Sequence, residues 1–426
     1  MRFDYGKEGI EIILNSNWNT TILSSIRKDP IKNPKESIKS ALKNPLGTDP
    51  LKKILEDKKQ FNRICVIVSD ATRPVPSYII LEGLVEELNE YGVSDDKILV
   101  LIATGLHRSS RKEDIERILG KQLKDRINVR DHDATDKDNL TFLGYASDGI
   151  PIYVNKTFLE SDVKILTGYV EPHFFFGFAG GRKSIIPGIA GVETILTNHS
   201  AKNIASEYAR FGVYEQNPMA ANSTEISKII GTDFVINVCI NESHEIVNIA
   251  AGDLERVHEN LVRYQMEHVF REIALPYDIV ICGNGGYPLD LNLYQAVKSM
   301  AIGEMAVKEG GTIVSVNECS EGVGIGQDEF KEMLFSGMGP KEIYQKILSE
   351  ELILPDQWEI QVLARVLMKA EIYVISKLKE KELGKIGLKH ADTVEEAIEI
   401  SIKKHGPNSR ILLLPNGPQV LPLLKK

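Results

Sequence analysis

Residues that can carry out acid–base and anion chemistry follow three short apolar runs of the chain. Asp70 and Arg73 come directly after ICVIVS, and His107 comes shortly after ILVLIA. His173 and Lys183 lie further along, in EPHFFFGFAGGRKS, after the third run VKILTG. Ligands of an open parallel sheet bind beyond the carboxyl ends of its strands, where loops and helix N-termini meet. If the runs are neighbouring parallel strands, they form one rim with two imidazoles, a carboxylate and several cations, which suits an anionic substrate.

Each of these residues also has a structural interpretation. Asp70 could cap a helix N-terminus, because a carboxylate there accepts backbone N–H bonds, and capping is compatible with ligand contact. Arg73 carries a planar fork that suits a carboxylate or a phosphate, although it could also pair with a surface acid. His107, followed by Arg108, is the stronger candidate because it is one of two histidines on neighbouring predicted loops and imidazole titrates near neutral pH.

The run GFAGGRKS is close to a phosphate-binding loop but departs from its pattern. Arg182 stands where that pattern has a glycine directly before Lys-Ser. Gly177, Gly180 and Gly181 would still allow a close backbone approach to a ligand. We therefore expect Lys183 to be a phosphate clamp or a nucleophile, because burial and nearby cations move the pKa of an amine. A solvated lysine is the alternative.

His199 follows this loop in the segment ETILTNHS. Its distance from His173 matches neither the HxH nor the HExxH spacing, so the sequence carries only a weak metal signal. Taken alone, His199 is expected to be a packed or capping histidine.

A second glycine loop follows the run YDIVICG and leads into LNLYQAVKSM. Gln295 and Lys298 are three residues apart, so they share one face of the predicted helix. A solvated helix face is the alternative interpretation. Pro288 takes the place of the last glycine of a dinucleotide-binding fingerprint, which argues against an ordinary NAD-dependent dehydrogenase.

Short β-branched runs alternate with loops and helix-period segments along the chain, which is typical of an α/β fold. Strands with this composition are buried on both faces, so we expect mainly parallel sheets covered by helices. The length of 426 residues predicts two or three domains. The best boundary lies in REIALPYD, which gives an N-terminal domain over 1–270 and a C-terminal α/β domain over 271–426. A last strand at 409–425 could belong to either domain.

The charge balance argues against a nucleic-acid partner. Lys and Arg number 51 against 60 Asp and Glu, so the net charge of −9 offers no global basic field for a polyanion. The longest apolar runs fall short of the ~20 residues that span a bilayer, and the first residues lack an export signal. We expect a cytoplasmic protein with no membrane partner. Its cysteines should be buried and reduced: Cys65, Cys239, Cys282 and Cys319.

The combination of DATRP, ATGLHR, EPHFFFGFAGGRKSIIPG, TNHS and LNLYQAVK resembles the nickel-dependent lactate racemase family. The resemblance covers essentially the whole chain in the family's order and approximate spacing. It implies an isomerase, a racemase or epimerase that inverts C2 of a 2-hydroxy acid such as lactate or a close relative. It also implies an active site in the cleft between two domains.

The resemblance further implies a cofactor, the nickel-pincer nucleotide Ni(II) pyridinium-3,5-bisthiocarboxylic acid mononucleotide, and hence cofactor-maturation proteins as partners. By position, Lys183 is similar to the lysine that bonds covalently to this cofactor, and His199 is similar to the protein's nickel ligand. The residues that match cofactor contacts are Asp70, Ala71, Thr72, Arg73, Lys183 and His199.

The catalytic and substrate-side residues also follow from the resemblance. His107 and His173 match the pair of catalytic bases, while Arg73, Gln295 and Lys298 match the residues that bind the substrate. In the family's mechanism one histidine takes the hydroxyl proton while a hydride leaves C2 for the cofactor, giving a planar 2-keto acid. Because the hydride can return to either face, two opposed bases are required.

Several features leave the substrate and the reaction class open. The rings Phe174, Phe175, Phe176 and Phe178 surround His173 in sequence, and we hypothesise that at least one lines the substrate side-chain pocket, with core packing as the alternative. Trp358 is a further lid candidate. Two other functions are compatible with the same residues: a nickel-independent carboxylate-binding hydrolase or lyase, and a two-domain anion-binding protein.

Overall fold

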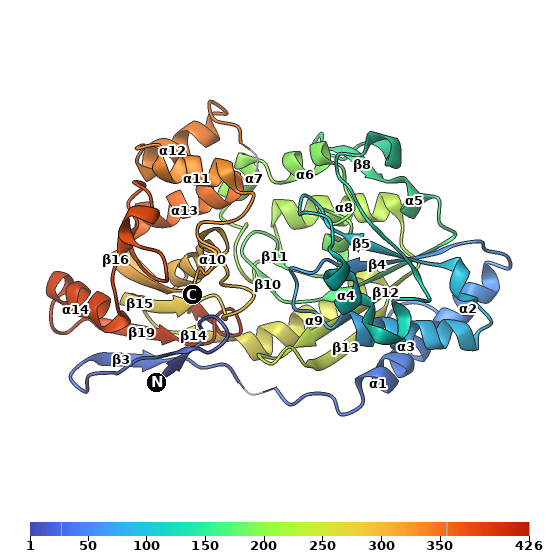
Figure 1. Ribbon diagram of the computed structural model, residues 1–426, viewed down its shortest axis with the longest axis horizontal. Coiled ribbons are helices and arrows are strands. Elements are labelled where there is room, and N and C mark those ends of the chain that lie inside the picture. The colour runs from blue at the N-terminus through green and yellow to red at the C-terminus, as the bar shows by residue number, and fades with distance from the viewer. Residues whose placement is uncertain (27, 355–356, 426) are drawn as a thin grey trace. The chain divides into compact units, whose positions relative to one another are not determined.

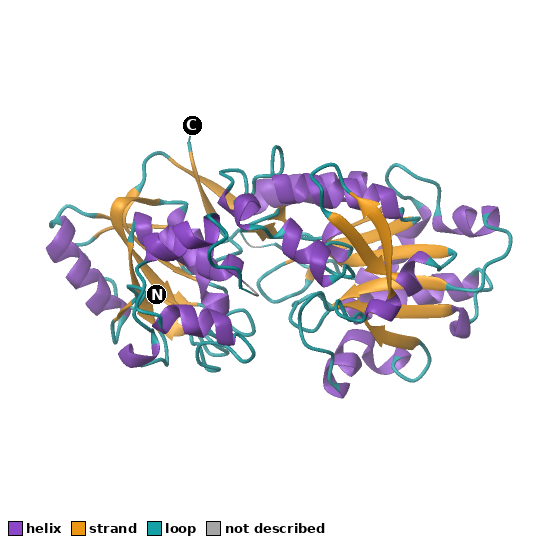
Figure 2. Ribbon diagram, turned by 90° about the horizontal axis from the view of Figure 1, so that it is seen from above, coloured by secondary structure: helices purple, strands orange, loops and turns teal. Residues whose placement is uncertain are grey.

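The computed structural model describes residues 1–26, 28–354 and 357–425, and the chain forms two compact units. The central unit comprises residues 28–266, and the flanking unit comprises 1–26 together with 267–425. Each unit holds one six-stranded sheet flanked by helices, drawn in orange and purple in Figure 2. This confirms the expected two-domain α/β architecture.

The sheet of the central unit has the strand order β13-β12-β9-β4-β5-β6. All neighbours are parallel except β12 and β13, which are antiparallel. Its strands are β4 (Ile64–Ser69), β5 (Ile98–Ala103), β6 (Asn128–Asp131), β9 (Val163–Tyr169), β12 (Phe234–Ile240) and β13 (Ile246–Gly252).

Burial on both faces explains why these strands are continuous apolar runs. Ile64, Val66 and Val68 pack into the core formed with α1 to α4. The intervening Cys65 and Ile67 point to the other face of the sheet and are also fully buried. Both faces of β4 are thus removed from water, as expected for a parallel sheet covered by helices.

The remaining elements of the central unit cover this sheet and shape its rim (Figure 1). The helices are α1 (Pro34–Lys43), α2 (Leu51–Asp57), α3 (Ser77–Glu90), α4 (Lys112–Leu123), α5 (Lys156–Leu159), α6 (Val192–Asn198), α7 (Ala201–Ala205), α8 (Pro218–Ile230) and α9 (Leu254–Val269), the last of which ends in the flanking unit. Two small hairpins and three 3-10 turns complete the unit: β7 (Leu140–Tyr145) with β8 (Pro151–Asn155), β10 (Pro172–His173) with β11 (Gly177–Phe178), η1 (Asp95–Lys97), η2 (Lys137–Asn139) and η3 (Gly181–Ser184).

The sheet of the flanking unit has the order β18-β17-β16-β15-β19-β3, and every pair in it is parallel. Its strands are β3 (Asn19–Ile22), β15 (Tyr277–Gly283), β16 (Val307–Val316), β17 (Glu371–Ile375), β18 (Lys389–His390) and β19 (Arg410–Leu414). The other elements are β1 (Arg2–Phe3), β2 (Ile10–Glu11), β14 (Phe270–Ile273), β20 (Leu421–Leu424), α10 (Leu293–Glu304), α11 (Asp328–Phe335), α12 (Pro340–Leu348), α13 (Gln357–Lys369), α14 (Val394–His405) and η4 (Glu380–Glu382).

The expected N-terminal domain over 1–270 is wrong at its start, because the first 26 residues belong to the flanking unit. Parallel pairing with β19 gives β3 its place at the edge of that sheet, which Figure 1 shows as blue β3 beside red β19. The later boundary falls after residue 266, close to the expected one. The closing segment stays in the flanking unit, since β19 pairs with β15 and β20 pairs with β14.

The four cysteines are free and buried, as expected, and burial raises the pKa of the Cys65, Cys239 and Cys282 thiols to about 12. They are therefore poor nucleophiles. Among the described residues no helix is both long enough and apolar enough to cross a membrane.

Candidate active site

The carboxyl ends of β9, β4 and β5 lie side by side in the central sheet. β4 is parallel to β5 on one side, with Ser69 opposite Ala103, and parallel to β9 on the other. The loops that follow these three strands contain the residues predicted for acid–base and anion chemistry, namely Asp70, Arg73, His107, His173 and Lys183. The prediction that these three strands are parallel neighbours is thus confirmed.

Asp70 and His107 form a pair across two of these loops. His107 Nδ1 lies 2.9 Å from Asp70 Oδ2, and the Thr72 hydroxyl donates to the same carboxylate at 3.0 Å. Burial alone raises the pKa of Asp70, but His107 and Arg73, with the Thr72 hydrogen bond, hold it below its usual value. The buried carboxylate is therefore ionised, while the His107 side chain remains 42% exposed.

The helix-capping alternative for Asp70 is not observed. The N-cap of α3 is Pro76, and no side chain caps that helix. The carboxylate is directed instead to the imidazole of the neighbouring loop, which fixes the orientation of the His107 ring.

His173 lies in the hairpin of β10 and β11, where its partner in register is Gly177. The backbone N–H groups of Phe175 and Phe176 point to His173 Nδ1, at 3.2 and 3.4 Å. The rings of Phe174, Phe175 and Phe176 lie with their centroids between 5.1 and 5.7 Å from the imidazole. The tight turn therefore holds the His173 imidazole through backbone hydrogen bonds and through packing of the phenylalanine rings.

Phe176 connects three of the predicted site residues. Lys183 Nζ lies 4.5 Å from the centroid of its ring, and the rings of His199 and His173 lie 5.4 and 5.7 Å away. The ring is completely buried. Lys183, His199 and His173 are thus gathered around one aromatic side chain.

His199 ends α6 and is buried. Its Nδ1 lies 3.0 Å from the carbonyl oxygen of Ile195, which can only accept, so Nδ1 carries the hydrogen and Nε2 the lone pair. Burial, and after it the Lys183 cation, lowers the pKa of His199 to about 3. The packed histidine expected from sequence is therefore also a neutral imidazole with the chemistry of a metal ligand.

The glycines of the GFAGGRKS run are required, but by the protein's own backbone. Gly177 and Gly180 both have positive φ angles, of 76° and 80°. A side chain at Gly177 would overlap the carbonyl of Val213, and one at Gly180 would come within 2.7 Å of the Tyr169 oxygen. These glycines thus allow a close approach to other backbone segments of the protein, whereas the sequence predicts a close approach to a ligand. The tightly packed loop places Lys183 on the short turn η3.

Arg182, the residue that breaks the phosphate-loop pattern, is buried beside Tyr214 and His258. Its Nη1 donates to the Tyr214 hydroxyl at 3.1 Å, and the guanidinium lies 4.5 Å from the centroid of that ring. His258 Nδ1 lies 3.5 Å away, while His258 Nε2 contacts the carbonyl of Ala179 at 3.2 Å. This cluster anchors the turn that carries Lys183. Sequence reasoning missed it because Tyr214 and His258 lie in segments without a motif.

Polar groups also gather around Gly168, near the end of β9. A Cβ at this position would lie 3.7 Å from Asn237 Oδ1 and Ser184 Oγ, and 3.8 Å from Ser69 Oγ. Asn237 Oδ1 accepts the Gly181 N–H at 3.0 Å, whereas its Nδ2 has no hydrogen-bond partner among the described residues. The signal for this residue in the sequence is an amide in the middle of the buried run FVINVCI.

The predicted substrate-side pair lies in the flanking unit. Lys298 Nζ donates to Gln295 Oε1 at 2.6 Å, so the two side chains do share one face of α10.

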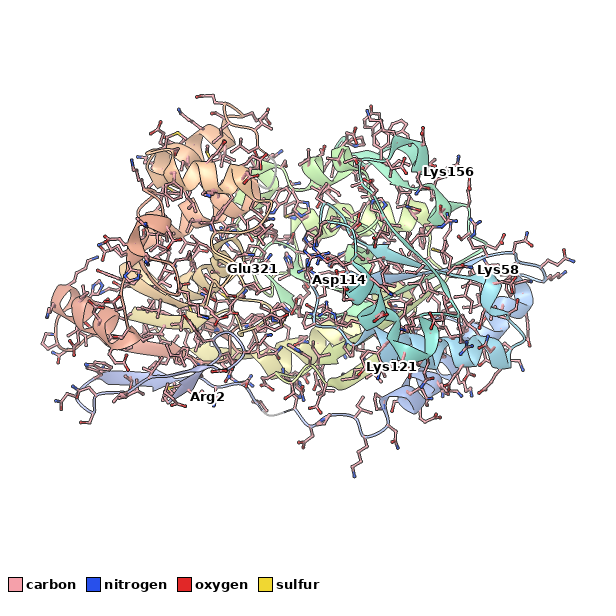
Figure 3. The ribbon with its side chains drawn as sticks, in the orientation of Figure 1. Arg2, Lys58, Asp114, Lys121, Lys156 and Glu321 are labelled. Atoms are coloured by element: carbon pink, nitrogen blue, oxygen red, sulfur yellow. The ribbon has the colours of Figure 1, made fainter. Side chains whose placement is uncertain are left out.

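Trp358, the lid candidate, is buried on α13. Arg108 forms an ion pair at 2.9 Å with Asp114, which is labelled in Figure 3.

Comparisons with known proteins identify the family. The sequence model of the lactate racemase N-terminal domain matches residues 5–212, and that of the lactate racemase C-terminal domain matches residues 273–421. The chain is 37% identical to the lactate racemase of Thermoanaerobacterium thermosaccharolyticum over 424 residues, which cover 99% of this chain and 96% of that protein. The chain belongs to the lactate racemase family.

Further matches agree with this assignment. The chain is 35% identical over 385 residues to the lactate racemase of Lactiplantibacillus plantarum, covering 90% of this chain and 89% of that one. The solved lactate racemase apoprotein of T. thermosaccharolyticum superimposes with a TM-score of 0.91 at 35% identity, covering 100% and 99% of the two chains. A crystal structure of a Thermotoga maritima protein shares the fold at 20% identity, with a TM-score of 0.70 and coverage of 94% and 100%.

The resemblance inferred from the sequence is thus confirmed. Racemases are isomerases, so the expected enzyme class is confirmed with it.

Proposed function

We propose that this protein inverts C2 of a 2-hydroxy acid, lactate or a close relative, with His107 and His173 as the acid–base pair. The observation that carries this proposal is the gathering of the Asp70–His107 pair and of His173, Lys183 and His199 on the loops of one unit. Family membership and the substrate named for the relatives in T. thermosaccharolyticum and L. plantarum support it. These properties favour a racemase over a hydrolase, a lyase or an anion-binding protein.

The residues fit the proposed cofactor, the nickel-pincer nucleotide. No group of three or more His, Cys, Asp or Glu side chains among the described residues could enclose a metal ion. A metal at His199 would therefore draw its other ligands from another molecule. The neutral imidazole of His199, with Nδ1–H bound to a carbonyl, is the form that ligates metals. The Nδ2 group of Asn237, which has no hydrogen-bond partner among the described residues, is a donor suited to an anionic or hydroxyl group of a nucleotide.

The chain would hold this cofactor through Lys183, as a covalent anchor, and through His199, as the nickel ligand. Asp70, Ala71 and Thr72 would contact it from the loop after β4. When bound, the nickel-pincer nucleotide supplies a reversible hydride acceptor.

His107 has the geometry of a general base for the substrate hydroxyl. Asp70 orients its ring through Nδ1, so Nε2 is the nitrogen that takes the proton. The ionised Asp70 then lies next to the imidazolium that forms and stabilises it. His173 would act at the opposite face of the same carbon.

The substrate carboxylate needs cations, and three side chains would supply its binding site. Arg73 follows the same strand as Asp70, and its guanidinium can bind a carboxylate with two hydrogen bonds. Lys298 and Gln295 would contribute from α10, where Gln295 already holds the ammonium in place at 2.6 Å. Phe176 is completely buried and packs against Lys183, His199 and His173, so it would position these three side chains from behind. The partners are thus a small 2-hydroxy acid and the proteins that make the cofactor.

Intact-mass spectrometry tests the proposal. Protein made together with cofactor-maturation proteins should carry an added mass that tandem spectra localise to Lys183. Lys183→Ala should lose this mass, whereas Lys156→Ala, which removes an exposed lysine of the same unit, should keep it. Absence of the adduct, while a lactate racemase matured in parallel carries one, would contradict the proposal.

A further inference from the structure

The two histidines of the site are held by partners of opposite character. His107 Nδ1 faces Asp70 Oδ2 at 2.9 Å. An ionised carboxylate can only accept a hydrogen bond, and the pKa of Asp70 is held below its usual value, so the hydrogen sits on His107 Nδ1. In the neutral ring Nε2 then has no hydrogen and offers a lone pair.

His173 has the reverse arrangement. The backbone N–H groups of Phe175 and Phe176 are directed at its Nδ1, at 3.2 and 3.4 Å. A backbone N–H can only donate, so His173 Nδ1 must be the acceptor. In the neutral ring the hydrogen therefore sits on Nε2.

The hairpin that follows His173 maintains this arrangement. His173 and Gly177 are paired in register across β10 and β11, so the residues between them form a tight turn. The turn leaves the N–H groups of Phe175 and Phe176 inside it, aimed back at the imidazole. Phe175 and Phe176 are buried, and packing of their rings keeps the backbone in place.

We propose that the two histidines carry opposite tautomers and are therefore not interchangeable: His107 is poised as proton acceptor and His173 as proton donor. This inference rests on the proposed function for its meaning in catalysis. For the enantiomer whose hydroxyl faces His107, the O–H bond breaks and an N–H bond forms at Nε2. The imidazolium that results lies beside Asp70, and the substrate oxygen retains the electron pair.

The other enantiomer meets a different situation. A hydroxyl that faces His173 finds an N–H where it needs a lone pair. His173 must first carry its hydrogen on Nδ1, which is incompatible with both backbone hydrogen bonds of the turn. The Phe175 and Phe176 backbone groups are thus positioning groups that make the two directions of the reaction start from unequal states.

Nitrogen NMR on the protein without cofactor measures the tautomers directly. Protein labelled with ¹⁵N-histidine is studied at a pH where both rings are neutral, and the resonances are assigned by their loss in His107→Gln and His173→Gln. Long-range correlations separate the two nitrogens, because Nε2 couples to both ring C–H groups and Nδ1 mainly to Hε1. The unprotonated nitrogen should be Nε2 in His107 and Nδ1 in His173. The same tautomer in both rings, or the reverse assignment, would overturn the inference.

Two variants provide the controls. Asp70→Ala removes the acceptor, so His107 should shift to the Nε2–H tautomer that prevails for histidine in water, while His173 stays unchanged. Thr72→Val removes a donor to Asp70 but leaves the Asp70–His107 contact, so it should keep the original pattern. A change of both rings in either variant would count against separate local control.

The outcome is independent of the adduct on Lys183. A missing adduct would defeat the proposed function and leave the tautomers as measured. Equal tautomers in a protein that accepts the cofactor would defeat only this inference.

Discussion

The two units have the same architecture and use the carboxyl ends of their strands differently. In the central unit, a buried Asp70 after β4 turns its carboxylate to an imidazole that is 42% exposed. In the flanking unit, Asp290 lies in the loop after β15 and turns its carboxylate to the chain itself, accepting the N–H groups of Gly6 and Glu318 at 2.7 and 2.9 Å.

The electrostatics of these two carboxylates are opposite. Positive and hydrogen-bonding neighbours outweigh burial at Asp70 and lower its pKa, whereas burial is the dominant influence at Asp290 and raises its pKa. The same edge of a parallel sheet can thus support chemistry or join distant segments. The deciding factor is whether a titratable partner or a backbone amide faces the carboxylate.

Replacing Asp70 by Ala should have the largest effect, and it should fall on catalysis. Without the carboxylate, His107 loses both its orientation and the charge that stabilises its protonated form. We expect kcat of the cofactor-loaded enzyme to fall by roughly 10²–10⁴-fold, measured by chiral analysis of lactate inversion. Retention of the Lys183 adduct in the same sample would show that the loss is catalytic. A decrease of less than about threefold would mean that the pair is not catalytic.

Replacing Asp290 by Ala should instead reduce stability. Two partly buried backbone N–H groups lose their acceptor, and each costs about 1–3 kcal/mol where water cannot replace it. The free energy of unfolding in urea should therefore decrease by about 2 kcal/mol or more, while Asp70→Ala should change it less. An unchanged unfolding midpoint in Asp290→Ala would remove the contrast between the two carboxylates.

Replacing Lys298 by Ala should affect binding in the cofactor-loaded enzyme. Loss of one charged hydrogen bond to the substrate carboxylate costs about 1.5–3 kcal/mol, so KM should rise roughly tenfold or more. Lys308→Ala, which removes an exposed cation of the same unit that pairs with Asp278, provides the control. Equal kinetics in the two variants would argue that α10 does not meet the substrate.

The smallest effect concerns pH. Burial, and after it Arg182, lowers the pKa of His258 well below its ordinary value, so the ring stays neutral in the folded protein. As the pH falls below about 6.5, the unfolded chain takes up a proton that the folded chain refuses, and stability decreases. His258→Gln should reduce this acid slope of the unfolding free energy by about 1.4 kcal/mol per pH unit. An identical slope in both proteins would contradict the neutral assignment.

Much of the site was predictable because strand ends are visible in a sequence. The runs before Asp70, His107 and His173 are buried on both faces, which makes them parallel strands and places their loops together. Gln295 and Lys298 lie on one face of their helix, as their three-residue spacing predicts. The roles proposed for Lys183 as the covalent anchor and for His199 as the nickel ligand rest on family resemblance, since neither residue stands in a spacing that specifies that role.

Other features depended on contacts that no local pattern encodes. Arg182 meets Tyr214 and His258 through packing of segments far apart in the sequence. The place of β3 follows from an edge of the flanking sheet that the sequence does not mark, because its run NTTI is short and polar. The Arg182 cluster and the place of β3 both result from tertiary contacts between distant segments, and the local structure of each segment does not reveal them.

The pairing of β3 with β19 sets an order of events on the ribosome. β3 is synthesised at the very start, and the strand that receives it is synthesised near the very end. The central unit is one continuous stretch, so all of its sheet is available before its neighbour can be completed. The central unit of the nascent protein can therefore fold before β3 pairs with β19. This pairing joins segments from the two ends of the chain, and such long-range contacts form slowly.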